Sequence, residues 1–164
     1  MPTRRNVLTA LAAAPLAACA HRVGLTRRSL RVATLNIWHD AGNWAVRRDL
    51  IAAVLRAADA DVIALQEVLQ DAKKQLPNQA ETLAQLLGGY AVHFSSTSPT
   101  GAANRYGNAI LSRLPVLATD WRKLAPLSDY RTALRVRVDP GGQPVDVVTT
   151  HLAWEPNRAA VRVE

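Results

Sequence analysis

The chain has 164 residues, which is enough for one domain with a real core once any targeting segment is removed. Its formal net charge of +7 suggests a nucleic-acid-binding protein, but six of the 20 Lys and Arg residues precede residue 32, where no acidic residue occurs. From residue 32 onward, 14 basic residues accompany 13 acidic ones, so the composition argues against a broad basic face. The single cysteine, Cys19, excludes intrachain disulfides and cysteine-based zinc sites.

The first 24 residues have the pattern of an export signal. Arg4 and Arg5 resemble a twin-arginine motif, and the 14 uncharged residues at 7–20 are too few to span a bilayer but suit a signal sequence. Residues 16–19, Leu-Ala-Ala-Cys, resemble a bacterial lipobox. We therefore expect a lipoprotein signal and the start of a tether at 1–24, a basic linker at 25–29, and lipidation of Cys19. The chain would then be exported and anchored to a membrane at its periplasmic face. The alternative is a basic leader or a buried alanine-rich helix.

Two strand-like segments, residues 30–40 and 61–69, each run from apolar into polar residues. The first apolar run stops at Asn36, and the second runs into Gln66 and Glu67. Residues between them recur at helical spacing and predict a helix with an apolar stripe toward the core. The stripe consists of Val46, Leu50, Ala53, Val54 and Ala57.

A strand–helix–strand unit usually has parallel, adjacent strands, so we expect Asn36 and Glu67 at the same sheet edge. Open α/β sheets bind ligands at this edge. A carboxylate where a buried strand leaves its sheet is costly unless it is paired, hydrated or bound to a cation. Glu67 is therefore the first candidate functional residue. The alternative is that Glu67 is a solvated strand end and Asn36 a turn residue.

The rest of the chain predicts a mixed sheet. Strands are expected at 90–95, 107–112, 116–124, 132–138 and 145–152, with loops at 70–79 and 96–107. Asn78 and Glu81 predict a capped helix start, and alternation at 132–138 is typical of an antiparallel strand with one wet face. His151 would lie at the end of the last strand, and Pro156 would begin a helix.

Five segments, in this order, resemble the endonuclease/exonuclease/phosphatase superfamily of metal-dependent phosphoesterases, which includes deoxyribonuclease I and bacterial sphingomyelinases. They are VATLNIW at Asn36, DVIALQEV at Glu67, YGNAILSRLPV at Asn108, YRTALRV at Arg131 and VVTTHLAW at His151. The resemblance covers residues 30–164. It implies an α/β fold: the N-terminal half of a four-layer sandwich, with two mixed sheets face to face and helices outside.

The resemblance also implies roles for single residues. Glu67 would bind a metal ion, Mg²⁺ with Mn²⁺ or Ca²⁺ as alternatives, and Asn36 would help to orient metal and phosphate. Mg²⁺ prefers oxygen ligands, which fits this pair. His151 would donate a hydrogen bond to the scissile phosphate, and Arg131 and Asn108 would contact the phosphate. The alternatives are a strand-end imidazole for His151, a surface position for Arg131, and a turn before a strand for Asn108.

The family's second half carries Gly-Asp-x-Asn and Ser-Asp-His motifs, which do not occur after the resembling segments. We therefore expect part of an exported magnesium-dependent phosphoesterase that is inactive alone, with the inner face of its first sheet exposed. The alternative is a non-catalytic, membrane-anchored binding module. A hydrolase of another type is disfavoured because no G-x-S-x-G, H-E-x-x-H or phosphate-loop motif occurs. Nucleic acid, a phospholipid headgroup or a small phosphate ester all remain open as substrates, and so does the oligomeric state.

Overall fold

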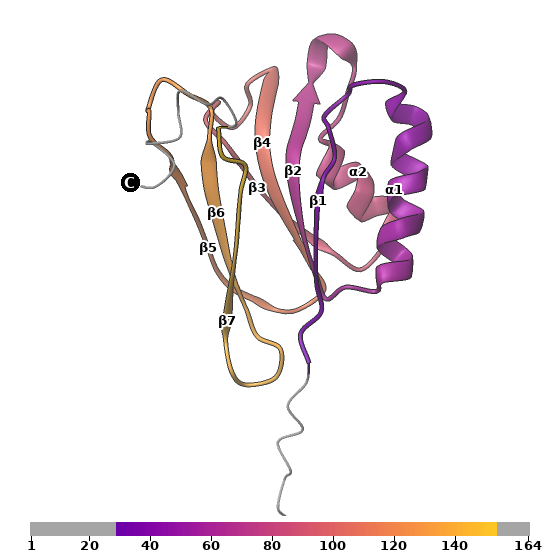
Figure 1. Ribbon diagram of the computed structural model, residues 1–164, viewed down its shortest axis with the longest axis vertical. Coiled ribbons are helices and arrows are strands. Elements are labelled where there is room, and N and C mark those ends of the chain that lie inside the picture. Colours follow the sequence, from indigo (N-terminus) through magenta and orange to yellow (C-terminus); the bar gives the residue numbers. More distant parts are fainter. Residues whose placement is uncertain (1–28, 154–164) are drawn as a thin grey trace, which may run out of the picture.

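The computed structural model describes residues 29–153 as two β-sheets packed face to face, with helices covering the outer side of one sheet (Figure 1). This confirms the expected α/β class and layering. The first sheet has the order β1-β2-β4-β3 and the second β5-β6-β7. The strands are β1 (Val32–Asn36), β2 (Val62–Asp71), β3 (Ala91–Ser96), β4 (Asn104–Ser112), β5 (Val116–Lys123), β6 (Thr132–Val138) and β7 (Val145–Thr150). The helices are α1 (Trp44–Ala58), the 3₁₀ turn η1 (Ala72–Lys74) and α2 (Gln79–Leu87).

The strand–helix–strand prediction is confirmed. β1 and β2 are parallel, and Asn36 lies opposite Gln66. β1 is shorter than the predicted segment, because residues 37–40 turn away from the sheet. The predicted loop at 70–79 is wrong in part, since β2 continues to Asp71 and η1 follows. The loop at 96–107 is also shorter than predicted, because β4 begins at Asn104, paired with Asp71.

Two hydrophobic clusters lie on opposite sides of the first sheet. One fills the space beneath the helices and the other the space between the sheets, where Ala64 and Ile110 meet Leu134 and Val136. The expectation of an exposed inner face is therefore wrong for β2 and β4, because β6 and β7 cover them. It holds only at the edge strand β1, where Val32 is 50% exposed.

The side of α1 that faces the core is the opposite of the predicted one. Ala52 and Leu55 are buried, and Trp44 and Ile51 pack against the same cluster. The predicted stripe instead faces solvent: Val46, Leu50, Ala53, Val54 and Ala57 are all exposed. Since α1 has apolar residues on two sides, periodicity could not choose between them. The sheet receives the side that carries the bulky Trp44, Ile51 and Leu55.

Two other local predictions are confirmed. The side chain of Asn78 caps α2 by accepting from the backbone N–H groups of Ala80 and Glu81. β6 alternates as predicted, with Leu134 and Val136 fully buried. Within residues 29–153, no helix is long and apolar enough to span a membrane. The signal segment with Cys19 and the helix predicted at Pro156 lie outside the described residues.

Candidate functional site

The candidate site lies where β1 and β7 end and β6 begins, next to the middle of β2, in the upper part of the sheets in Figure 1. A bulge in β2 creates it. Pairing between β2 and β4 shifts between Leu65 and Val68, and Glu67 within this gap has φ +59°, a left-handed conformation that is unusual for a non-glycine residue. The bulge removes Glu67 from the regular ladder and turns its side chain to the sheet edge.

Asn36 and Glu67 are in direct contact, as their predicted positions required. Asn36 Nδ2 donates to Glu67 Oε1 at 3.0 Å, and Asn36 Oδ1 accepts from the backbone N–H of Trp38 at 2.8 Å. The N–H of His39 donates to the carbonyl of Glu67 at 3.1 Å. The Glu67 side chain is only 15% exposed. Asn36 therefore holds the Glu67 carboxylate, and His39 holds the backbone that carries it.

His151 and Arg131 lie on the other side of Glu67 from Asn36. Arg131 Nη1 lies 3.0 Å from His151 Nδ1 and 3.2 Å from the His151 carbonyl oxygen, so one guanidinium nitrogen contacts both the ring and the backbone of His151. His151 Nε2 lies 3.7 Å from Glu67 Oε1. Arg131 is 4% exposed, so the alternative of a surface arginine is wrong.

Arg131 also determines which ring nitrogen of His151 carries the proton. Burial lowers the pKa of His151, the positive charge of Arg131 lowers it further, and Glu67 acts in the opposite direction. Because Arg131 can only donate, Nδ1 must accept, and a neutral imidazole then carries its proton on Nε2. At 3.7 Å, Glu67 is too far for an ordinary hydrogen bond, so this N–H can be offered to a ligand.

Asn108 is buried and ties the sheets together. Its Nδ2 donates to the backbone carbonyl of Thr132 at 2.9 Å and approaches Thr132 Oγ1 at 3.1 Å. It lines a small hollow together with Arg131 and His151. The structure thus brings Asn108 to the predicted site, but its side-chain amide nitrogen already donates to Thr132 of β6.

Sequence reasoning missed two groups at this edge. Tyr106 lies in the same hollow, and burial, with a further contribution from the charge of Glu67, raises the pKa of its hydroxyl well above the usual range. Arg47 of α1 donates to the carbonyls of Ile37 and His39 at 2.7 and 2.8 Å. No local pattern marks either residue, because each acquires its role through contacts between distant segments.

The residues present fit part of a magnesium site. Glu67 supplies a hard, partly shielded carboxylate, and Asn36 orients it. Among residues 29–153, no group of three or more His, Cys, Asp or Glu side chains gathers closely enough to hold a metal ion. Mg²⁺ keeps several water ligands and often takes others from substrate phosphate, so one carboxylate is an acceptable share of its shell.

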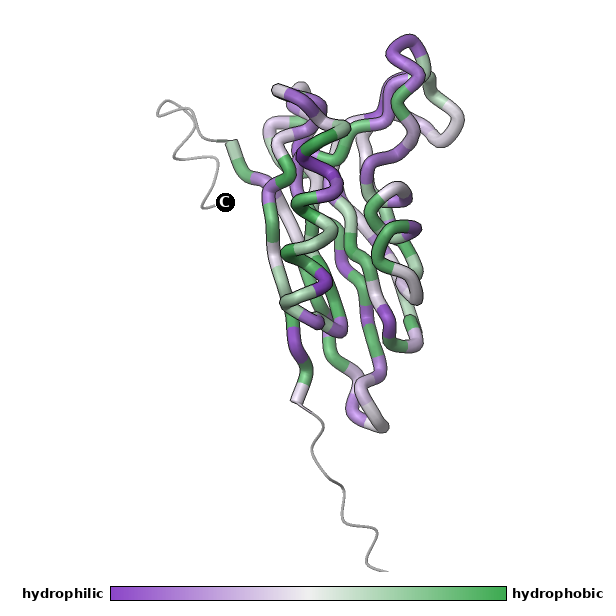
Figure 2. Tube along the Cα trace, turned by 90° about the vertical axis from the view of Figure 1, so that its right-hand side faces the viewer, coloured by the Kyte–Doolittle hydropathy of each residue, from purple (hydrophilic) through white to green (hydrophobic). Residues whose placement is uncertain are grey.

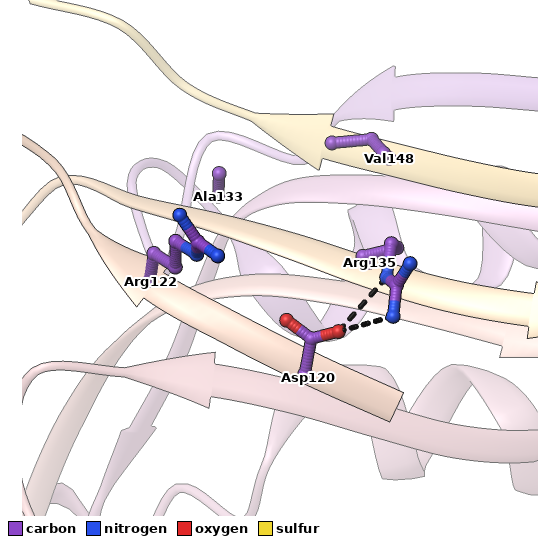
Figure 3. A pocket seen from close by; sticks show the side chains of 5 residues that line it. All are labelled: Asp120, Arg122, Ala133, Arg135 and Val148. Atoms are coloured by element: carbon purple, nitrogen blue, oxygen red, sulfur yellow. Dashed lines mark hydrogen bonds and ion pairs between the residues drawn. The ribbon is translucent and has the colours of Figure 1, made fainter. Parts of the chain in front are cut away.

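A second hollow, of about 290 Å³, lies on the outer face of the β5-β6-β7 sheet (Figure 3). Asp120, Arg122 and Arg135 line it, and Arg135 pairs with Asp120 through contacts of 2.8 and 2.6 Å. None of the predicted site residues lines this hollow.

Comparison with models of known protein families identifies one family. Residues 33–164 match the Endonuclease/Exonuclease/phosphatase family. An endonuclease/exonuclease/phosphatase family protein from Leptotrichia buccalis C-1013-b has a similar structure, with 20% identity and a TM-score of 0.61 over 76% of this chain and 55% of that one. TDP2 from C. elegans has 23% identity and a TM-score of 0.62 over 81% and 38%.

D. rerio TDP2, solved in complex with a single-strand DNA product, has 22% identity and a TM-score of 0.63 over 81% of this chain and 50% of that one. At these identities, the likeness to solved structures shows the fold alone. No curated protein matches the chain. The chain spans between 38% and 55% of the length of these three solved structures.

Proposed function

Because this chain belongs to the Endonuclease/Exonuclease/phosphatase family, we propose that the cluster around Glu67 is the phosphate- and metal-binding part of a phosphoester hydrolase site. The observation that carries the proposal is the meeting of the ends of β1 and β7 with the bulge in β2: Glu67 contacts Asn36 at 3.0 Å and lies 3.7 Å from His151. A carboxylate for a cation thus lies beside an N–H donor for an anion.

In this proposal each residue has a separate task. Glu67 holds a divalent cation, Mg²⁺ or alternatively Mn²⁺ or Ca²⁺, and Asn36 keeps the carboxylate turned toward it. Such a cation, when bound, would polarise a phosphoryl oxygen. His151 donates its Nε2 proton toward a phosphate oxygen, and Arg131 keeps that tautomer by donating to Nδ1. The Arg131 charge stabilises the negative charge that develops on the phosphate.

The substrate is proposed only as a class, a phosphodiester or phosphomonoester. D. rerio TDP2 was solved with a DNA product, and this likeness supports a nucleic acid as one candidate. A phospholipid headgroup and a small phosphate ester are the others, and the nearly balanced charge after residue 32 favours none of them. We also propose that the protein is exported and lipid-anchored at Cys19, on the pattern of residues 1–24.

The test is the substitution Glu67→Gln in the natural full-length protein. This substitution removes the charge of the side chain with little change in its volume. Hydrolysis of bis-p-nitrophenyl phosphate is measured against magnesium concentration. We expect most activity to be lost and the magnesium dependence to weaken. Glu81→Gln, at an exposed position on α2, is the matched control and should leave activity unchanged. Normal activity of Glu67→Gln at limiting magnesium would show that Glu67 does not bind the cation.

A further inference from the structure

The outer side of α1 carries an apolar stripe that nothing in residues 29–153 covers. Val46, Leu50 and Val54 are 55%, 62% and 65% exposed. Ala53 and Ala57 are also exposed and complete the stripe. It follows one side of the helix over three turns, about 16 Å. Figure 2 looks onto α1, where green, apolar residues recur along the tube. Scattered exposed side chains need no explanation, but a continuous row opposite the buried side of a helix indicates an interaction surface.

The charged groups around this stripe favour an anionic partner. The acidic residues on and just after α1 are paired with arginines: Asp49 with Arg48 at 3.5 Å, and Asp59 with Arg113 at 2.6 Å and Arg31 at 2.9 Å. α1 itself carries three arginines and one acidic residue, and Arg31 pairs with Asp59 where α1 ends. In the sequence, residues 20–30 add three arginines and no acidic residue. An apolar helix side flanked by arginines is typical of attachment to anionic lipids.

The loop between β1 and α1 carries an exposed indole. Trp38 is 57% exposed, and the Arg47 guanidinium lies 5.5 Å from the centre of its ring. Arg47 follows Val46 on the helix and contacts the carbonyl of Ile37, so the indole is held close to the start of the stripe. Tryptophan is enriched where protein meets the headgroup layer of a bilayer, because its ring is apolar and its N–H is polar.

We propose that α1 is a membrane-docking helix, whose apolar stripe enters the interface of an anionic phospholipid bilayer. A second copy of the chain fits less well. A stripe about 16 Å long on a helix about 10 Å wide offers far less area than the roughly 800 Å² per partner of a stable dimer. A bilayer needs no matching partner surface, because shallow insertion of a few side chains is enough when basic residues assist.

Docking by α1 would also orient the candidate site. The backbone N–H of Trp38 donates to Asn36 Oδ1, and Asn36 contacts Glu67, so the exposed indole and the site share one hydrogen-bonded loop. Insertion of the stripe and Trp38 therefore places this edge of the sheets close to the bilayer surface. The proposal does not depend on catalysis, because it concerns binding to lipid alone.

The experiment is co-sedimentation of the full chain with vesicles of phosphatidylglycerol and phosphatidylcholine in equal parts, and with vesicles of phosphatidylcholine alone. All proteins carry Cys19→Ser, so that no lipid anchor contributes. We expect the chain to bind the anionic vesicles, and to bind the neutral vesicles much more weakly. Val54→Glu should weaken it about tenfold, since a carboxylate replaces an inserted side chain and is repelled by anionic lipid. Val148→Glu, at a valine 58% exposed on β7, is the matched control and should bind normally.

Two further measurements keep the test decisive. Leu50→Ser with Val54→Ser removes apolar surface without adding charge and should also weaken binding, while the melting temperature changes little at these exposed positions. Unchanged vesicle binding in this double variant and in Val54→Glu would overturn the proposal. A dimer would also overturn it, if analytical ultracentrifugation without vesicles detects the dimer and Val54→Glu dissociates it. The stripe would then be covered by a second copy of the chain.

Discussion

Gly107 lies where β3 and β4 approach each other too closely for any side chain. A Cβ at this position would be 1.8 Å from the carbonyl oxygen of Ser95, whereas ordinary contact begins near 3.4 Å. Neither backbone can rotate away, because Ser96 pairs directly with Gly107 in the sheet. Gly107→Ala must therefore push the two strands apart at the point where β4 delivers Tyr106 and Asn108 to the candidate site.

The cost follows from what that separation would break. Overpacking alone costs about 1 to 3 kcal/mol. The displacement also strains the buried contacts between the sheets, Ser95 Oγ to Thr132 Oγ1 at 2.9 Å and Asn108 Nδ2 to the Thr132 carbonyl at 2.9 Å, which contribute about 1 kcal/mol each. We expect Gly107→Ala to lower the free energy of unfolding by about 3 to 5 kcal/mol.

Urea denaturation followed by circular dichroism measures this loss. Gly89→Ala is the control, because a Cβ there would meet nothing within 4 Å and only the left-handed φ of +74° is disfavoured. It should cost about 1 to 2 kcal/mol. A Gly107→Ala protein as stable as the Gly89→Ala protein would mean that β3 and β4 separate freely, and the reasoning from close approach would fail.

Three other predictions concern pH, anchoring and activity. Burial lowers the pKa of His93, whose Nδ1 contacts Thr119, so the unfolded chain binds a proton at this residue more readily than the folded one. The free energy of unfolding should therefore fall as the pH drops below about 6.5. This fall should be smaller in the His93→Gln variant. Wild-type cells given a clickable fatty acid should label the protein, and Cys19→Ser should remove the label; labelling that persists in Cys19→Ser would disprove the lipobox. The 164-residue chain alone should hydrolyse neither bis-p-nitrophenyl phosphate nor plasmid DNA, because no group of three or more His, Cys, Asp or Glu side chains gathers among its described residues, and Glu67 alone would hold a cation too weakly to polarise a phosphoryl oxygen. Magnesium-dependent turnover that Glu67→Gln abolishes would refute this.

The strands and the sheet edge could be predicted from sequence because each depends on local pattern. Strand β6 alternates strictly, and parallel pairing of β1 with β2 follows from the helix between them. The side of α1 that faces the sheet could not be predicted, because Leu50 and Leu55 belong to two apolar stripes of similar strength. Only packing against the sheet distinguishes them, and it buries Leu55.

The position of Glu67 was predictable, but the conformation that makes it useful was not. Three residues at the site edge, Trp38, His39 and Glu67, have φ of +56°, +36° and +59°, which costs roughly 1 kcal/mol or more each for non-glycine residues. Such strain persists only where other contacts enforce it. Here the Arg47 guanidinium binds the carbonyl of His39, and the His39 N–H binds the carbonyl of Glu67. A helix arginine thus stabilises the loop that adjoins the Glu67 bulge. Two of the three strained residues are Glu67 and Trp38, to which we assign metal and membrane contacts, and His39 joins them through its hydrogen bond to Glu67.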